Sequence, residues 1–470
     1  MAQTLALKQI GPIPLVATVA AGIILGPLNS TMLAVTLSPL AEDFGVSTGW
    51  AAWLIASYLI VMAAGQPITG RLGDLVGRRR LFIAGLVYFG AASALAMVSW
   101  NFPSLVFFRV QQAVGGALFM PNGIAALRSS LPQEMRGRAF GSLGAIIAVS
   151  AGVGPPLGGV LVDTIGWRAL FAVNLPLVVA AIALALRYFP HIPGDRSRQA
   201  FDILGMIVLS AGLFALIVAT TTLGRKSPSD PVFVTTALLA LALGALFIWW
   251  EGRHPSPIIS LGMFRRRTYA AGTATIFLSN LGMYTVLIVA PLFLQDLRGN
   301  SASRAGLMLL AISLFVVLLA PISGLVADRV GRNVPAVAGA LLLTLGAVAV
   351  ATWDGASSMA YIAMSLGLFG IGLGVIQAPV QTAAIEACPA SMAGAASGTY
   401  STARYLGAIV GTGLVGAFLS DGELTEVSVF RQLMLVLAVI VALTVVSTLN
   451  IHRWAEAPGP TREEMGDSAS

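Results

Sequence analysis

The chain has 470 residues, of which 57% are hydrophobic and only 10% are charged, and its mean hydropathy is +0.87. This composition excludes a string of soluble domains, a disordered chain, a collagen-like repeat and a disulfide-stapled module, and it indicates a protein solvated mainly by lipid. The net charge of +7 suggests a nucleic-acid partner only until the basic residues are placed, and the single Cys388 excludes an internal disulfide.

The apolar residues recur in blocks of about 20, the length that a helix needs to cross the hydrocarbon core of a bilayer. We therefore predict an all-α polytopic membrane protein. Its fourteen predicted spans are 13–38, 50–70, 81–99, 103–127, 139–162, 167–188, 203–223, 232–250, 268–294, 304–323, 334–352, 358–384, 394–419 and 431–451. The first block follows Lys8 as a signal peptide would, but it is too long for one, and we expect it to remain as the first helix.

The basic residues are distributed unevenly about these spans. Nineteen Lys and Arg fall on the side that holds both termini, and six fall on the opposite side. The positive-inside rule then predicts cytoplasmic termini in the cell membrane, and it explains the net charge without a nucleic-acid partner. No loop is long enough for a soluble domain, so we expect the function to lie within the helical bundle.

One short motif occurs twice. The pattern G-x-x-x-D-x-x-G-R includes Asp74 and Arg78 in its first copy and, 254 residues later, Asp328 and Arg332 in its second. Each copy is expected in a loop between two helices on the basic side, where the Asp pairs with the Arg or caps the next helix. Such a clasp would hold helix ends together in one conformation and release them in another. The alternative, a merely short basic turn, accounts less well for two copies.

The distance between the two copies covers eight spans rather than six. We therefore predict two six-helix units with an extra helix pair between them. The predicted domains are an N-terminal bundle (1–188), two linking helices with basic connectors (189–267), and a C-terminal bundle with a cytoplasmic tail (268–470). Transporters are often built from such repeated halves, with the substrate between them.

These and two further segments resemble a known family. The paired turns resemble motif A of the major facilitator superfamily, and residues 152–159 (GVGPPLGG) resemble its antiporter motif. Residues 166–176 (GWRALFAVNLP) resemble the segment that opens span 6 in fourteen-span drug:proton antiporters of the EmrB/QacA type. Residues 109–116 (RVQQAVGG) resemble the family's R-x-x-Q-G motif, with Ala113 in place of Gly. The resemblance implies a major facilitator fold with two linking helices, alternating access and drug efflux.

The segment 152–159 lies in the fifth predicted span. Its glycines, Gly154 among them, allow close helix packing, while Pro155 and Pro156 remove backbone donors and bend the helix. Such a pliable place suits a rocking interface between two bundles. Glycine and proline are also common in membrane helices generally, so ordinary packing is the alternative.

Ionisable groups inside the spans are further candidates, because they are costly in hydrocarbon and usually functional. All three His and all twenty acids fall in loops, tails or span ends, and only Arg109 and Arg404 lie well inside spans. We expect Arg109 to face a cavity, since a structural cation without a partner is expensive in lipid. For Arg404, a cavity-facing role and snorkelling to the interface stay equally open.

The first helix lacks an acid that the family pattern typically has. Asn29 occupies that position, and both Asn29 and Arg109 are expected roughly 9–14 Å from the outer face on antiparallel helices. An amide cannot exchange a proton near neutral pH, so ordinary proton coupling is in doubt. Asp163 and Glu386, at the margins of spans, are the remaining acids that could couple. A hydrogen bond that joins helices is the alternative role for Asn29.

Polar residues of the second half are weaker candidates. Asn280 and Tyr284 are four residues apart in the ninth span, and Gln377 and Gln381 repeat that spacing in the twelfth, so each pair shares one helix face. These spans occupy the places in the second repeat that the first and fourth occupy in the first. Each pair is therefore a cavity candidate, with a packing role equally open.

We predict an alternating-access transporter that exports amphipathic small molecules, is not an enzyme and uses no cofactor or metal. The expected partners are a small-molecule substrate, the lipid bilayer and, if coupling persists, protons; we expect a monomer. Uptake or exchange of an anionic or zwitterionic solute held by Arg109 is the alternative within transport. A membrane-bound enzyme is the alternative of another class, and the lack of a carboxylate pair, histidine cluster, phosphate loop or metal-ligand set disfavours it.

Overall fold

The structure is a computed structural model that describes residues 12–191, 202–223, 230–254, 257, 259, 261–389, 392–419, 424 and 426–452. Within these residues every regular element is helical, as the sequence predicts. The predicted cytoplasmic tail, from residue 453 onward, and much of the first basic connector lie outside the described residues.

The N-terminal helices follow the first six predicted spans. Their bounds are α2 (Pro12–Ile23), α3 (Leu25–Ala34), α4 (Leu37–Phe44), α5 (Thr48–Ala51), α6 (Trp53–Val76), α7 (Arg78–Met97), α8 (Phe102–Ser130), α9 (Gln133–Thr164), α10 (Ala169–Ala172) and α11 (Asn174–Tyr188). The first predicted span is thus divided at Ile24, and the sixth at Val173. The second, fourth and fifth spans extend beyond their predicted ends, because the helices continue into polar sequence that a search for apolar blocks does not detect.

The remaining helices follow the other eight predicted spans. Their bounds are α12 (Ile203–Leu223), α13 (Pro231–Glu251), η1 (Leu261–Arg265), α14 (Arg267–Leu292), η2 (Phe293–Leu297), α15 (Ala302–Val330), α16 (Asn333–Ala351), α17 (Met359–Glu386), α18 (Ala393–Phe418) and α19 (Val427–Thr448). The turn of π-helix in η2 directly continues α14, so the two form one long segment.

Side-chain caps fix where several helices begin. Asn101 Oδ1 accepts a hydrogen bond from Ser104 N at 2.8 Å before α8, and Asp230 Oδ1 accepts one from Val232 N at 2.9 Å before α13. Ser301 caps α15 in the same way. A capped first turn leaves fewer N–H groups unsatisfied, which lets these helices begin sharply.

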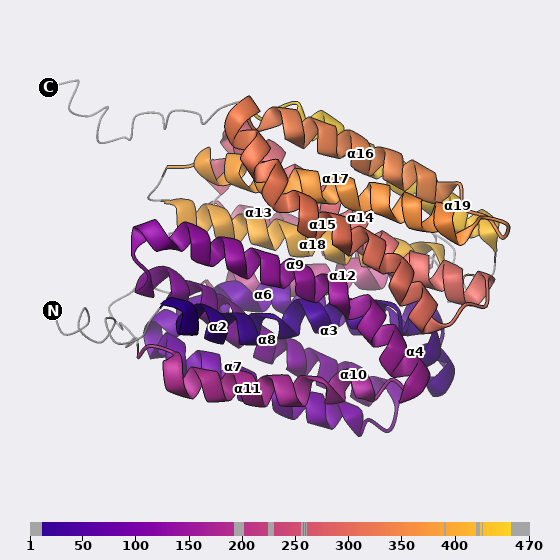
Figure 1. Cartoon of the computed structure of the whole chain (residues 1–470), viewed down its shortest axis with the longest axis horizontal. Coiled ribbons are helices and arrows are strands. Elements are labelled where there is room, and N and C mark those ends of the chain that lie inside the picture. The colour runs from indigo at the N-terminus through magenta and orange to yellow at the C-terminus, as the bar shows by residue number, and fades with distance from the viewer. Residues whose placement is uncertain are drawn as a thin grey trace, which may run out of the picture.

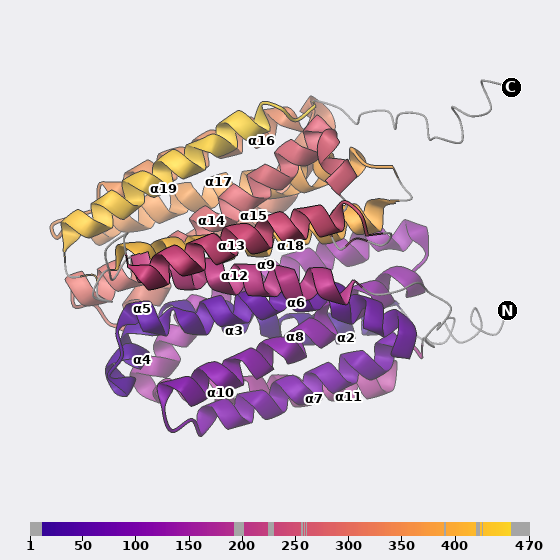
Figure 2. The ribbon, with the colours of Figure 1, turned by 180° about the vertical axis from the view of Figure 1, so that it is seen from behind.

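The helices run side by side along one common direction (Figure 1). The N-terminal helices, indigo to purple, form the lower part of the bundle and the C-terminal helices, orange to yellow, form the upper part; Figure 2 shows the same arrangement from behind. The start of α2 and the end of α19 lie at one end of the bundle, which we call the terminal side. The end of α9 and the start of α15 lie at the opposite end, the far side.

The linking helices lie between the two halves (Figure 2). α12 contacts α6 of the first half and α18 of the second half, and α13 packs mainly on α12. Only 6% of the most apolar stretch of α13 is buried, so this helix lies at the periphery. The pair therefore joins the halves through α12 and presents α13 to the surrounding lipid.

Eleven helices within the described residues are long and apolar enough to cross a membrane. They include helices of both halves and α13 of the linking pair, which indicates an integral multi-pass membrane protein, as predicted. The predicted number of fourteen spans is not established by length and composition and stays a prediction.

The two copies of the repeated motif are not loops, and the expectation of a loop is wrong. Asp74 lies within α6 and Arg78 opens α7, so that Gly77 alone separates two helices; Gly331 marks the corresponding break between α15 and α16. Gly77 has a φ of +107° and Gly331 a φ of +92°, a backbone conformation that favours glycine because it has no Cβ. A left-handed backbone at one residue is enough to reverse the chain here, and both halves use it.

Buried apolar side chains form a large cluster that crosses from the first half into the second. It includes Leu33 and Phe171 of the N-terminal helices and Leu309 and Phe369 of the C-terminal helices. A smaller cluster around Phe82 lies within the first half. The two halves therefore share a packed interface in this conformation rather than touching only through their connection.

Candidate functional site

A buried polar cluster surrounds Arg109, in the interior of α8. The Arg109 side chain is fully buried, and its Nη1 donates hydrogen bonds to Asn29 Oδ1 on α3 and to Gln112 Oε1 on α8. Its Nε donates to the Leu54 backbone carbonyl oxygen at 3.2 Å. The contact between Asn29 and Arg109 agrees with the similar depths expected for them from the sequence. All three acceptors are neutral, so they solvate the guanidinium without neutralising it.

The aromatic ring of Tyr58 completes the surroundings of this cation. The guanidinium carbon of Arg109 lies 4.0 Å from the centroid of the Tyr58 ring, within the range of a cation–π interaction. Arg109 Nη2 and the Tyr58 hydroxyl are both buried, and neither has a hydrogen-bond partner within the described residues. The arrangement thus retains donors that a further group would satisfy.

The cluster continues away from Arg109 into two more helices. Gln112 Nε2 donates to Ser93 Oγ on α7 at 2.7 Å, and Asn174 Nδ2 on α11 lies 3.5 Å from the same oxygen. The role of Gln112 and Ser93 was not predicted from the sequence. The i, i+3 spacing of Arg109 and Gln112 is the signal that places them on one helix face, whereas Ser93 gives no such signal.

The second half places Arg404 and several tyrosines near this cluster. Arg404, on α18, is half-buried, and its Nε is buried without a hydrogen-bond partner among the described residues. Tyr284, on α14, has Arg404 and Arg109 in its electrostatic surroundings, together with Ser30 of α3. Gln66 Nε2 of α6 donates to the hydroxyl of Tyr405, the residue next to Arg404, at 2.8 Å, which joins the two halves directly.

Of the two polar pairs of the second half, Tyr284 has Ser30, Arg404 and Arg109 in its surroundings, whereas Asn280, Gln377 and Gln381 make no hydrogen bond to this cluster in the described part of the chain. Asn280 is buried and donates to the Ile276 carbonyl oxygen of its own helix at 3.0 Å. Gln377 is half-buried and Gln381 is exposed. Their predicted faces on α14 and α17 therefore stay candidates for contact with a substrate.

The glycine-rich segment of α9 lies between α3 and α15. A Cβ at Gly154 would meet Thr31 Oγ1 of α3, and one at Gly158 would lie 2.7 Å from the Met32 carbonyl oxygen of the same helix. On the opposite side, a Cβ at Gly152 would lie 2.7 Å from Ser313 Cβ of α15. Alternate glycines thus allow α9 to approach one helix of each half.

Two prolines lie in the same segment of α9, at the contact with α15. Pro155 and Pro156 lie inside a helix that continues from Gln133 to Thr164. A Cβ at Gly306 of α15 would meet the Pro155 carbonyl oxygen, so that backbone packs on backbone across the halves.

Polar contacts between the halves gather at the far side. Asp163 Oδ2, near the end of α9, accepts a hydrogen bond from Ser303 N at 2.8 Å and a second one from Ser303 Oγ in the first turn of α15. Gln295 Nε2 of η2 donates to the Val35 carbonyl oxygen at 3.0 Å. Packing and hydrogen bonds thus join the halves at the far side, beside a hollow whose lining includes Glu42, Thr48, Asp296 and Leu424.

The first copy of the turn motif forms the predicted ion pair. Arg78 Nη2 lies 2.8 Å from Asp74 Oδ1, and Arg78 Nη1 donates to the Ala125 carbonyl oxygen at 2.8 Å and to Ser129 Oγ at 3.2 Å. Arg78 therefore ties the junction of α6 and α7 to the end of α8.

The second copy forms a different ion pair. Arg332 pairs with Glu386 at the end of α17, whereas Asp328 is exposed and has no ion pair within the described residues. The expected pairing of Asp328 with Arg332 is thus not present in this conformation. Arg332 directly precedes α16, and the neighbouring helix end offers its carboxylate. Both arginines still fasten a helix start to the end of the next helix.

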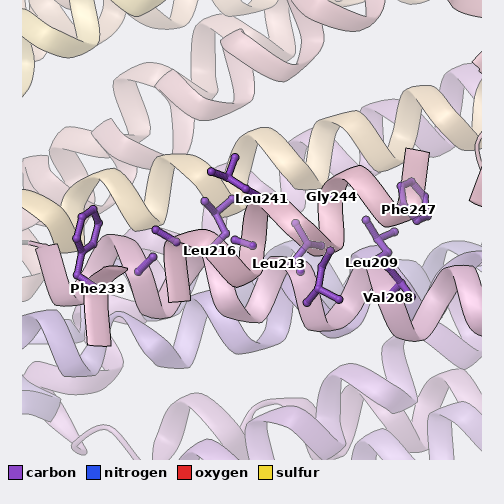
Figure 3. A pocket seen from close by; sticks show the side chains of 13 residues that line it. Val208, Leu209, Leu213, Leu216, Phe233, Leu241, Gly244 and Phe247 are labelled. Carbon is purple, nitrogen blue, oxygen red and sulfur yellow. The ribbon is translucent and has the colours of Figure 1, made fainter. Parts of the chain in front are cut away.

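An apolar groove between α12 and α13 is separate from these polar groups (Figure 3). Its lining is wholly apolar and includes Val208, Leu216, Phe233, Leu241 and Phe247. Such a lining offers a polar substrate group no side-chain hydrogen-bond partner. Within the described residues, no group of three His, Cys, Asp or Glu side chains could hold a metal ion.

A sequence profile of the Major Facilitator Superfamily matches residues 19–412. The chain belongs to this superfamily. The match covers nearly the whole chain, including the Arg109 cluster, the glycine-rich segment of α9 and both copies of the turn motif.

Similar proteins are named for resistance, export or transport. The multidrug resistance protein Stp of Mycobacterium tuberculosis is 33% identical over 84% of this chain and 73% of its own. The tetracenomycin C resistance and export protein of Streptomyces glaucescens is 29% identical, over 87% and 76% respectively. The riboflavin transporter RibZ of Clostridioides difficile is 26% identical, over 85% and 86%. Two of these three names state export or transport, and all three differ in the compound or compounds named.

A solved structure supports the fold. A bacterial homologue of the human drug peptide transporters PepT1 and PepT2 aligns with a TM-score of 0.64 over 94% of this chain and 98% of that chain. The identity is 16%, so this likeness shows the major facilitator fold alone.

Proposed function

We propose that the protein exports amphipathic small molecules from the cytoplasm or the inner leaflet of the cell membrane. The proposed machine has two six-helix bundles, within 1–188 and 268–470, joined by the helices of 189–267, with cytoplasmic termini and fourteen spans. The substrate would bind between the bundles, and alternating access would expose it to one side at a time. The export and resistance functions named for two relatives support this direction.

One observation carries the proposal: the halves meet through α9 and α15, and α9 also packs on α3, the helix that supplies Asn29 to the buried polar cluster around Arg109. A glycine-lined contact of this kind suits two bundles that rock against each other, because small residues allow two helix backbones to approach and separate. In the proposed orientation the far side is the outer side. The structure then corresponds to the outward-closed conformation, with Asp163 and Gln295 as its polar latches.

The coupling mechanism of this exporter is a separate part of the proposal. We assign the chain to the EmrB/QacA-like antiporter branch, with Asn29 as a departure at the coupling position. The two acids at the margins of the predicted spans already have partners in this conformation. Asp163 accepts a hydrogen bond from the start of α15, and Glu386 forms an ion pair with Arg332. Proton coupling is therefore expected to be weak for a substrate that does not itself titrate.

The direction of transport is tested in everted and right-side-out membrane vesicles with equal amounts of the full-length protein. An amphipathic dye should accumulate in everted vesicles, and Arg109→Gln should change the range of dyes accepted at equal protein abundance. Accumulation only in right-side-out vesicles would establish uptake instead. Chemical conversion of the dye without its movement would establish a membrane-bound enzyme.

A further inference from the structure

Two cations lie within long helices of the bundle, one in each half: Arg109 is fully buried and Arg404 is half-buried. Among the residues that the structure describes, neither Arg109 Nη2 on α8 nor the buried Arg404 Nε on α18 has a hydrogen-bond partner. Both arginines lie in the surroundings of Tyr284. A membrane protein rarely keeps such charges in its interior without a function, because a cation in a low-dielectric surrounding is expensive.

The spans provide no counter-charge for these arginines. Within the described residues, every Asp and Glu lies at or beyond the last turn of a helix end, and none contacts Arg109 or Arg404 through an ion pair. The partners of Arg109 are the amides Asn29 and Gln112, a backbone carbonyl oxygen and the ring of Tyr58. These groups provide dipoles and a π-face, but no negative charge.

Tyrosines of both halves lie near the two cations: the Tyr58 ring centroid is 4.0 Å from the Arg109 guanidinium carbon, and the hydroxyl of Tyr405, next to Arg404 in the chain, accepts from Gln66 Nε2 at 2.8 Å. Tyr58 of the first half has Tyr284 and Tyr405 of the second half, as well as Arg109, in its electrostatic surroundings. The buried Tyr58 hydroxyl has no hydrogen-bond partner in the described part of the chain. A ligand here would meet two guanidinium groups, phenol hydroxyls and ring faces together, which is the chemistry that recognises an aromatic acid.

We propose that the transported substrate is an organic anion with an apolar aromatic body, which serves as the counter-ion of Arg109 and Arg404. Its export is driven by the membrane potential without proton exchange. This inference rests on the proposed export function and specifies its substrate class and driving force. A cell interior that is electrically negative favours the exit of anions. A potential of 100 mV changes the equilibrium ratio of a monovalent anion by about 50-fold.

The absence of an acid at position 29 fits this mechanism. A carboxylate beside Arg109 would neutralise it and compete with the substrate for the same donors. An amide orients the guanidinium and leaves its charge available. Asn29 is therefore expected to set the preference for anions.

The test uses the purified full chain in proteoliposomes with two dyes of opposite permanent charge. The anion is 8-anilino-1-naphthalenesulfonate, whose sulfonate does not titrate between about pH 6 and 8, and the cation is ethidium. A potassium gradient with valinomycin sets the potential, and a separate pH gradient is imposed at zero potential. We expect protein-dependent sulfonate flux toward the positive compartment, rising with the potential and unaffected by the pH gradient.

Variants then assign the flux to the two arginines. Arg109→Gln and Arg404→Gln should each lower sulfonate flux about tenfold or more, and Arg109→Lys should retain part of it. Asn29→Asp should lower it comparably while leaving both arginines in place, which keeps the test valid if an arginine variant fails to fold. Arg304→Gln, which removes an exposed cation at the start of α15, is the matched control and should leave the flux unchanged.

Three results would overturn the inference in distinguishable ways. Flux of ethidium driven by the pH gradient, without sulfonate flux, would refute the anion class and preserve the exporter. Sulfonate flux that requires the pH gradient would refute the driving force alone. No protein-dependent flux of either dye under either gradient would refute both the inference and the proposed function.

Discussion

At the scale of single residues, the two copies of the repeated motif are alike in backbone and different in charge pairing. Gly77 and Gly331 share a positive φ, but Arg78 pairs with the acid of its own motif whereas Arg332 pairs with Glu386. The positive φ of the glycine is therefore repeated in the second copy, whereas the ion pair within the motif is not. The two aspartates are consequently expected to differ in importance.

Neutralising the first aspartate should affect transport more than neutralising the second. Asp74→Asn removes a partly buried ion pair worth about 1 kcal/mol, which is about a fivefold change in an equilibrium between two conformations. Asp328→Asn removes no ion pair seen in this conformation and should change the rate less than about twofold. The measurement is dye flux per molecule in vesicles with equal protein abundance, since insertion depends on the unchanged arginines. Equal losses in the two variants would contradict this asymmetry.

At the scale of elements, α9 is the helix of the first half that packs against α15 of the second half as well as against α3. Its glycines at 154 and 158 face α3, and those at 152 and 159 face α15, so that spacings of four and seven residues place two separate contacts on one helix. Backbone and side-chain atoms of the neighbouring helices fill the space that a larger side chain would need. The element therefore tolerates little increase in volume along this segment.

One methyl group should be enough to test that packing. Gly154→Ala would bring a Cβ against Thr31 Oγ1 and to 3.0 Å from the Leu28 carbonyl oxygen, and overpacking of this kind costs about 1–3 kcal/mol. We expect a lower Tm for the purified protein. The control is Gly144→Ala in the same helix, where a Cβ meets no atom within 4 Å. The packing argument fails if the two variants melt at the same temperature.

The sequence predicts elements better than it predicts contacts. The helical class, the repeated turns and the meeting of Asn29 with Arg109 follow from hydropathy, spacing and depth, which are properties of one helix at a time. The pairing of Arg332 with Glu386 depends on how the end of α17 lies beside the start of α16, which no local pattern encodes. Ser93 was missed for the same reason, since its role arises only when α7 packs on α8.

At the scale of the whole molecule, packing and hydrogen bonds join the two halves at the far side. α9, η2 and α15 meet there, while α12 contacts α6 and α18 alongside. If the protein works by alternating access, these far-side contacts must separate once in every cycle. Preventing their separation should therefore stop transport without disturbing either half.

A reversible cross-link between the halves should test this requirement. Asp163→Cys and Ser303→Cys place two thiols where a hydrogen bond now joins α9 to α15. Cys388→Ser provides the background for both substitutions, because Cys388 is the single native cysteine. Burial raises the pKa of the Cys388 thiol above the ordinary value. Oxidation should abolish flux in the double variant, and a reductant should restore it. Each single variant should be insensitive to oxidation, and undiminished flux in the oxidised double variant would show that the far side does not open.

The hydrogen bond from Ser303 N to Asp163 has a consequence for observing the protein. The start of α15 is completed by an acceptor that belongs to the other half, so this one backbone amide loses its partner whenever the halves part. Its exchange with deuterated solvent would then follow the fraction of time that the far side is open. The hydrogen-exchange rate of this single amide would thus report how often the far side opens, without any substitution in the native chain.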